Sequence, residues 1–156
     1  MRTLRRVLVL GTLMFWQGGL MVYGALVVPV ARAEFRDVLE RQAIVTSRVT
    51  FWLNLAGALA LVVWLWDLVV TRDRHSRRVR ARRVLWGLIL ATLATVMILH
   101  RGLDSMMSQS VGERDPHFFH VLHRAYLWVT TAQWAMAVTL LVLTLKAWQA
   151  EDAAIP

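Results

Sequence analysis

The residues with the greatest capacity for chemistry are four histidines in the second half of the chain, His100, His117, His120 and His123. Imidazole nitrogens bind copper, zinc and haem iron, and two imidazoles on different helices can hold one haem from its two faces. On one helix, His117 and His123 are about 120° apart, which makes them poor partners for one ion. A site would then combine His100 of the third span with either His120 or His123, with Asp104 as an additional candidate ligand, and the cofactor would be haem b or copper.

A role without any cofactor is the favoured alternative, because histidine at a membrane interface is more often a headgroup or hydrogen-bond partner than a ligand. The absence of cysteine excludes disulfides, thiolate metal sites, iron–sulfur clusters and covalent c-type haem. Ser105, Ser108 and Ser110 follow His100, but no nucleophile-elbow pattern surrounds them. The sequence therefore indicates no catalytic activity.

The elements that must position these histidines are membrane helices. The chain has 156 residues, of which 58% are hydrophobic, with a mean hydropathy of +0.51. Apolar stretches at about 7–30, 49–70, 84–103 and 121–145 are each long enough for a helix to cross a bilayer. We therefore expect an all-α polytopic membrane protein, a bundle of four transmembrane helices forming a single domain over residues 1–156.

Two connections between these spans have their own signals. Residues 31–48 are charged but carry apolar residues at helical spacing, which predicts an amphipathic interfacial helix on the outward side between the first and second spans. Asp115 followed by Pro116 predicts an N-cap and the first residue of the fourth helix.

The N-terminal stretch has a competing interpretation as a cleavable signal peptide. Arginines precede the apolar run, and Ala31-Arg32-Ala33 resembles a small-residue cleavage site. The apolar run is much longer than the central region of a signal peptide and contains Trp16 and Gln17. We expect the segment to be retained as the first span.

A block of seven arginines between the second and third spans predicts the orientation. These residues, which we assign to topology and lipid headgroup contact, are Arg72, Arg74, Arg77, Arg78, Arg80, Arg82 and Arg83. Loops rich in Lys and Arg stay in the cytoplasm, so both termini are predicted inside and the histidines outside. Because the positive charges flank membrane spans, the net charge of +8 does not indicate nucleic-acid binding.

Polar residues within the spans define a candidate intramembrane face, formed by Gln17, Asn54, Tyr126, Thr130 and Gln133. We expect Gln17 and Gln133, both near mid-depth, to form a direct hydrogen bond, since an unpaired amide in lipid is costly. Small and polar residues are expected on the inward faces, including a ridge of Gly87, Ala91 and Thr95 on the third span. These residues either hold the helices together through interhelical hydrogen bonds or line an outward-open cavity.

Other residues are assigned to the membrane interface. Trp66, Trp86 and Trp148 are expected in an inner aromatic belt, and Asp67 is close enough to the end of its span to reach the headgroups. The sequence shows neither a clearly broken helix at mid-depth nor a buried charged pair, and both are typical of transporters. A transporter is therefore the third hypothesis.

Several short motifs resemble those of the small four-helix membrane proteins similar to transmembrane protein 205. They are WQGG at Trp16–Gly19 with Pro29 and Phe35, then RQAIVTSRVTFWLN at Arg41–Asn54, and FFHVLHRAY ending at Tyr126. The family often has asparagine two turns after its histidine, where this chain has Thr130. A fainter likeness to copper-resistance D type membrane proteins would imply a periplasmic copper role. The first resemblance implies the four-helix fold.

Three functional hypotheses follow. The first is a non-enzymatic structural or accessory component of the cell (inner) membrane, with the lipid bilayer and a protein partner or second copy as its contacts. The second is an outward-facing copper- or haem-binding protein that acts in metal handling or electron transfer, and the third is a small transporter. No nucleic-acid partner is expected.

Overall fold

Four long helices make up the fold in the computed structural model, which describes residues 1–34, 39–107 and 115–154. Their bounds are α1 Arg2–Leu13, α2 Gly19–Val22, α3 Val28–Glu34, α4 Leu39–Val70, α5 Ser76–Met107 and α6 Pro116–Ala153. The pieces α1, α2 and α3 form one long helix, interrupted by two π-helical segments, Met14–Gly18 and Tyr23–Val27. We call α1 to α3 together the first helix. The prediction of four spanning helices in an all-α bundle is confirmed.

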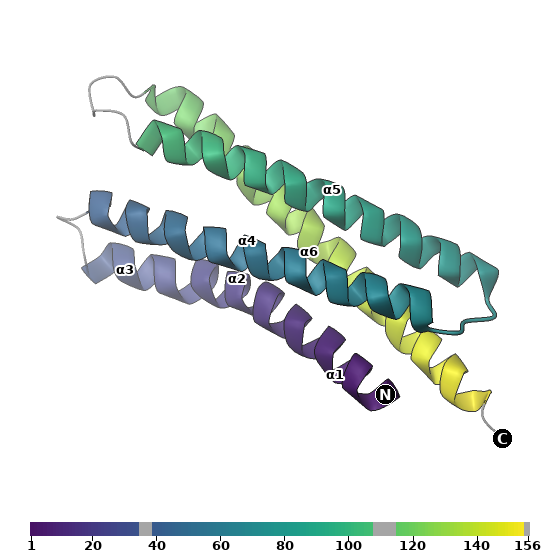
Figure 1. Cartoon of the computed structure of the whole chain (residues 1–156). Coiled ribbons are helices and arrows are strands. Elements are labelled where there is room, and N and C mark those ends of the chain that lie inside the picture. The colour runs from purple at the N-terminus through teal and green to yellow at the C-terminus, as the bar shows by residue number, and fades with distance from the viewer. Residues whose placement is uncertain (35–38, 108–114, 155–156) are drawn as a thin grey trace.

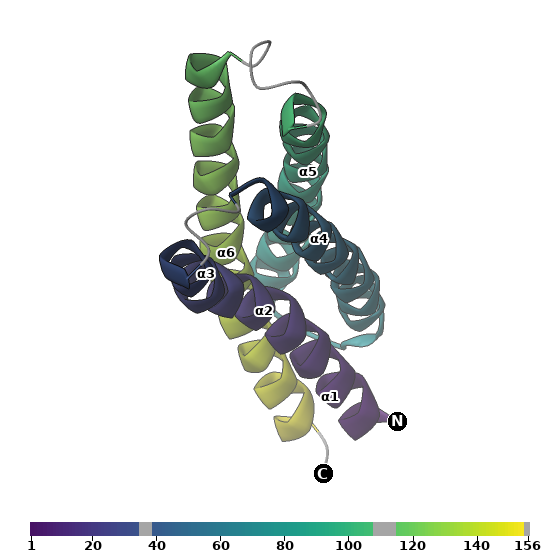
Figure 2. The ribbon, with the colours of Figure 1, turned by 90° about the vertical axis from the view of Figure 1, so that its left-hand side faces the viewer.

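The helices pack in chain order (Figures 1 and 2). The first helix lies along α4, α4 packs on α5, and α5 packs on α6 over the most extensive contact. Both termini and the short connection 71–75 lie at one end of the bundle, which we call the terminal end. The even number of crossings thus brings both termini to the same side, as the sequence predicts.

The helices extend beyond the predicted spans at both ends. Residues 39–48 are the first turns of α4, and α3 ends at Glu34, so the separate amphipathic helix predicted over 31–48 is wrong; residues 35–38 fall outside the described part. Most of the arginine block is likewise helical, because α5 already begins at Ser76. A helix continued past the hydrocarbon needs no new nucleus, so extension is favoured over starting another helix.

The start of α6 follows from its sequence. Asp115 has extended backbone angles, and its side chain accepts hydrogen bonds from the backbone N–H groups of His117 and Phe118, at 2.9 and 3.2 Å. Pro116, the first helical residue, has no N–H that would need a partner. The predicted N-cap is confirmed.

Large buried side chains fill the centre of the bundle. Trp16 is fully buried, and its indole lies against Gly57 of α4, where a Cβ atom would come within 2.8 Å of three ring atoms. Leu61, Ile89 and Leu140 pack in the same cluster. The absence of a side chain at Gly57 thus creates the space that this indole occupies.

The faces turned away from the bundle are strongly apolar, as expected for contact with lipid. Val69, Ile98 and Trp128 are at least 70% exposed. The ridge of Gly87, Ala91 and Thr95 also lies on an exposed face of α5, which contradicts its predicted inward position. Here α5 presents larger residues, such as Leu93, to its neighbours instead.

Candidate functional site: a buried ion network and a histidine cluster

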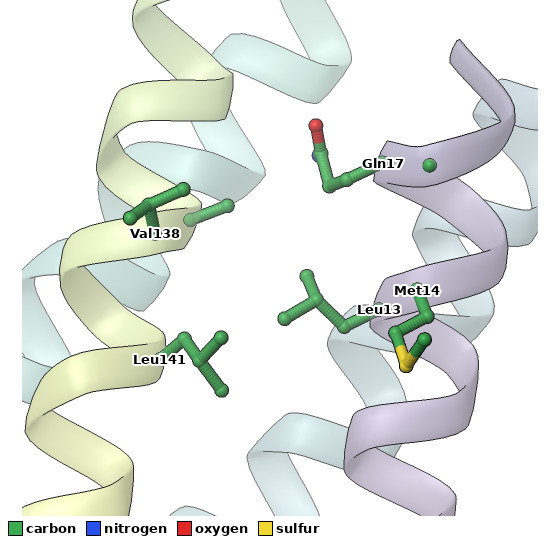
Figure 3. A pocket seen from close by; sticks show the side chains of 7 residues that line it. Leu13, Met14, Gln17, Val138 and Leu141 are labelled. Carbon is green, nitrogen blue, oxygen red and sulfur yellow. The ribbon is translucent and has the colours of Figure 1, made fainter. Parts of the chain in front are cut away.

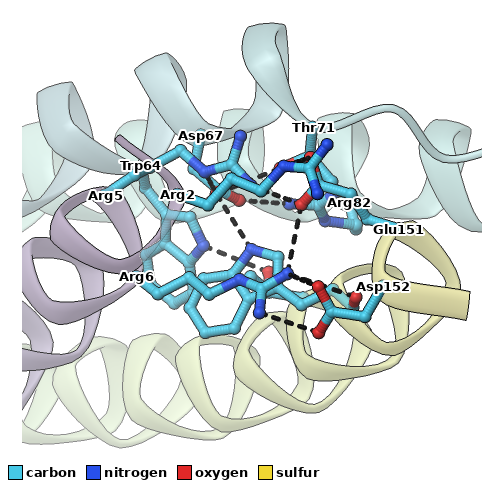
Figure 4. A network of polar contacts seen from close by, with 11 residues as sticks. Arg2, Arg5, Arg6, Trp64, Asp67, Thr71, Arg82, Glu151 and Asp152 are labelled. Carbon is cyan, nitrogen blue, oxygen red and sulfur yellow. Dashed lines mark hydrogen bonds and ion pairs between the residues drawn. The ribbon is translucent and has the colours of Figure 1, made fainter. Parts of the chain in front are cut away.

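The most distinctive polar feature is a buried carboxylate near the terminal end of α4. Asp67 has no exposed surface and lies between two buried arginines, with Arg5 Nε 2.9 Å from Oδ1 and Arg82 donating to Oδ2 at 2.6 Å. Oδ1 also accepts hydrogen bonds from Trp148 Nε1 at 2.9 Å and Thr71 Oγ1 at 3.0 Å. Both carboxylate oxygens are therefore occupied by donors from the surrounding helices (Figure 4).

A second acidic residue continues this arrangement on α6. Arg5 also donates to Glu151 at 2.5 Å, and Glu151 is itself almost fully buried. Arg6, next along the first helix, pairs with Asp152 at 2.7 Å and lies over the Trp148 ring, 5.4 Å from its centre. We call Arg5, Arg6, Asp67, Arg82, Glu151 and Asp152 the ion network.

The ion network joins all four long helices at one depth. The first helix and α5 supply its three arginines, while α4 and α6 supply its three carboxylates, so the formal charges cancel. A buried charge is costly unless it is paired, and removing one partner of a buried pair typically destabilises a protein by about 3–5 kcal/mol. The ion network therefore fixes the four helix ends relative to one another.

The ion network corrects three expectations. Asp67 does not reach the headgroups, Trp148 is buried instead of lying in an aromatic belt, and the chain does contain buried charged pairs. The π-helical segments also interrupt the first helix at Met14–Gly18 and Tyr23–Val27. One of the two stated grounds against a transporter, the lack of a buried charged pair, is thus wrong.

A signal for this network exists in the sequence. Asp67 is the only charged residue in the second apolar run, and Glu151 and Asp152 end the fourth helix. Arginines begin the first and third helices at the same membrane side. Arginines on two helices and carboxylates on the other two, all near the same membrane side, predict ion pairs between helices. A count of Lys and Arg made only to assign topology does not reveal these pairs.

The arginine block divides into paired and exposed residues. Arg82 belongs to the ion network, and Arg78 forms a two-point contact with Asp73, at 2.5 and 2.6 Å. The Arg78 guanidinium lowers the pKa of Asp73, which lies in the connection 71–75. The other five members, Arg72, Arg74, Arg77, Arg80 and Arg83, are exposed.

The opposite end of the bundle holds a smaller group, the His100 cluster, made of Ser47, His100 and Asp104. Ser47 Oγ donates to Asp104 Oδ1 at 2.7 Å and lies 3.5 Å from His100 Nε2. The His100 ring stacks on Phe51 and lies 6.5 Å from the Tyr126 ring. Helices α4 and α5 thus bring an imidazole and a carboxylate to one hydroxyl group.

The other two candidate ligands lie on α6. His120 is exposed with its ring edge-on to Phe119, and the half-buried His123 ring stacks on the same phenylalanine at 6.1 Å. Among the described residues, no three His, Asp or Glu side chains group closely enough to hold a metal ion. The structure therefore does not gather His100, His120 and His123 into one such group.

The predicted polar face lies largely inside the bundle. Asn54 and Gln133 are fully buried, Tyr126 and Gln17 are 8% exposed, and Thr130 is half-buried. Asn54 Nδ2 lies 3.5 Å from the Tyr126 hydroxyl, and Thr130 Oγ1 donates to the backbone carbonyl of Tyr126 at 2.8 Å. These polar groups therefore pair mainly with neighbouring helices and their own backbone.

The predicted bond between Gln17 and Gln133 is wrong. Gln133 Nε2 instead approaches α5, 3.4 Å from Thr92 Oγ1, and its Oε1 has no partner. Gln17 Nε2 is buried and also has no partner. Because the first helix packs along α4, its glutamine does not reach the amide on α6.

Comparisons with known proteins give no assignment. No protein-family model, curated protein or solved structure matches this chain.

Chemically, the two polar groups have different capacities. The ion network is charge-balanced, and its central contacts between Arg5, Asp67, Arg82 and Glu151 are buried, so it is suited to holding helices together. The His100 cluster has a titratable imidazole and a carboxylate near one end of the helices, so it is suited to hydrogen bonding or to binding a cation.

Proposed function

We propose that this chain is a non-enzymatic four-helix protein of the cell (inner) membrane, with both termini in the cytoplasm, serving as a structural or accessory component. The observation that carries this proposal is the ion network, which connects every long helix through buried, charge-balanced contacts. Such a network favours one fixed arrangement of helices. Their exposed apolar faces are then available to lipid, a protein partner or a second copy.

The proposed orientation is supported by the exposed arginines. Five members of the block remain in solvent-facing positions near the same end as both termini. Anionic lipid headgroups on the cytoplasmic leaflet attract such side chains, with about 1 kcal/mol per residue near the surface. Placing this end in the cytoplasm satisfies the positive-inside rule.

A copper or haem protein is the second candidate, favoured by the His100 cluster. Ser47 approaches both Asp104 and His100, which places an imidazole nitrogen and a carboxylate oxygen close together on α5. Both are ligand types that divalent metals accept. A complete site would need further ligands from a partner or from solvent.

The position of the ion network argues against the third hypothesis, a small transporter. The ion network provides the buried charges that transporters use, but it lies at the ends of the helices. Substrate sites of secondary transporters lie near mid-depth, between helix halves.

One experiment separates the first two candidates: the visible absorption spectrum and metal content of the full chain, purified in mild detergent. We expect a colourless protein without stoichiometric metal. A Soret band or bound copper that disappears in His100→Ala or His123→Ala would overturn the structural role. His75→Ala is the matched control, because His75 is exposed at the terminal end.

A further inference from the structure

An apolar pocket of about 260 Å³, open to the outer surface, lies between the first helix and α6 (Figure 3). Leu13, Met14, Gln17 and Gly18 line it from the first helix, and Ala137, Val138 and Leu141 line it from α6. The two helices are tied together at the terminal end by the pairs of Arg5 and Arg6 with Glu151 and Asp152. Beyond that tie, the first helix follows α4 while α6 follows α5, which leaves the pocket between them.

Gln17 is the only lining residue with a polar side chain. It is 8% exposed, it extends from the first helix toward α6, and its Nε2 has no hydrogen-bond partner. Leaving a buried amide donor unpaired costs about 1–3 kcal/mol. Gln17 lines the pocket with its apolar atoms, and its Nε2 is buried behind the pocket wall. The terminal torsion of glutamine is soft, so a ligand's acceptor oxygen can draw an N–H group toward the pocket.

The site therefore combines an apolar cavity with one unsatisfied donor. Gly18 adds open space, because a Cβ atom placed there would meet nothing within 4 Å. Met14 is 72% exposed beside the pocket, and Val138 is 41% exposed on the α6 side, so the pocket is reached from the lipid-facing surface. A matching ligand has an apolar body and a hydrogen-bond acceptor.

The depth of Gln17 in the membrane limits which ligands can reach its amide. Gln17 is twelve positions after Arg5, about 18 Å along the helix, near the middle of the apolar run 7–30. The ester carbonyls of bilayer lipids lie at the edge of a hydrocarbon core about 30 Å thick. Their acceptor oxygens are therefore too shallow to meet this amide.

We infer that the pocket binds a lipid-soluble molecule with a carbonyl oxygen on an apolar body, of the alkyl quinone or long-chain ketone type, and that Gln17 donates to that oxygen. This goes beyond the proposed structural role and is independent of the His100 cluster. The metal and absorption measurements test that role, whereas ligand binding at Gln17 tests this inference.

The test is ligand retention by the full chain immobilised in detergent, measured with three probes: a decyl-substituted benzoquinone, a long-chain ketone and an alkane of matched length. We expect both carbonyl probes to bind more tightly than the alkane. The carbonyl probe that is retained more tightly identifies the ligand class. Failure of both carbonyl probes to bind would overturn the inference.

Two variants locate the binding. Gln17→Leu removes the donor, so carbonyl-probe affinity should fall up to about ten-fold while alkane binding is unchanged. Gly18→Leu fills the pocket and should abolish retention of all probes. Gly11→Leu is its matched control, since Gly11 also has open space around its Cβ position but does not line the pocket.

The remaining outcomes are also decisive. Equal carbonyl affinity in Gln17→Leu and the native protein would overturn the inference, as would retention that survives Gly18→Leu. A native dimer that dissociates in Gly18→Leu, without probe binding, would assign the pocket to a second copy instead. Gln17→Leu should unfold no earlier than the native protein, because it removes an unpaired buried donor.

Discussion

Trp148 donates its indole N–H to Asp67 at 2.9 Å, a contact between residues 81 positions apart that joins α6 to α4. The same carboxylate faces Arg5 and Arg82, so one aspartate side chain contacts the first helix, α5 and α6. We therefore expect the loss of Asp67 to weaken contacts among all four long helices.

Asp67→Asn should therefore destabilise the protein strongly. The substitution leaves the buried Arg82 guanidinium without its carboxylate and Arg5 with Glu151 alone, and breaking a buried pair typically costs about 3–5 kcal/mol. Thermal or denaturant unfolding in detergent measures the loss. Asp152→Asn is the matched control, because Asp152 is 52% exposed in its pair with Arg6 and should cost less than about 1 kcal/mol. Equal losses in both variants would contradict a central role for Asp67.

Gly57→Ala should disrupt the contact between the first helix and α4. The added methyl group would overlap the fully buried Trp16 ring, which would have to shift against the residues packed around it. Overpacking of this kind costs about 1–3 kcal/mol. Gly87→Ala, with nothing within 4 Å of its Cβ position, should be neutral or slightly stabilising in its helix. Unfolding midpoints that rank the two variants in reverse order would exclude this packing.

The absence of native cysteine allows a clean topology test. Single cysteines at the exposed positions Arg74 and His117 should lie on opposite sides of the membrane. In intact cells, a membrane-impermeant maleimide should label His117→Cys and spare Arg74→Cys until the cells are opened. The reverse pattern would place both termini outside and invalidate the proposed orientation.

Asp115→Ala should loosen the first turn of α6. The side chain occupies two backbone N–H groups that otherwise have no partner within the helix. Loss of an N-cap costs about 1 kcal/mol, so amide hydrogen exchange at His117 and Phe118 should accelerate. Exchange near Trp148, at the far end of the same helix, is the internal reference and should not change.

The sequence was sufficient for the features governed by local rules. Apolar length predicted four spans, and Asp115 with Pro116 predicted the start of α6, because both depend on neighbouring residues along one helix. The pairing of Gln17 was predicted wrongly, since its partner depends on which helices are neighbours. The expectation that Asp67 reaches the headgroups fails likewise, because its distance from the span end says nothing about the arginines on other helices.

The chain order of the ion network has a consequence for how the protein enters the membrane. Asp67 and Arg82 lie on consecutive helices joined only by residues 71–75, so they can meet as soon as this hairpin has been synthesised. Their pairing balances these two buried charges within the hairpin, before the first helix and α6 pack against it. Arg5 can meet Asp67 at the same stage, whereas its contact with Glu151 forms only after α6 has been synthesised.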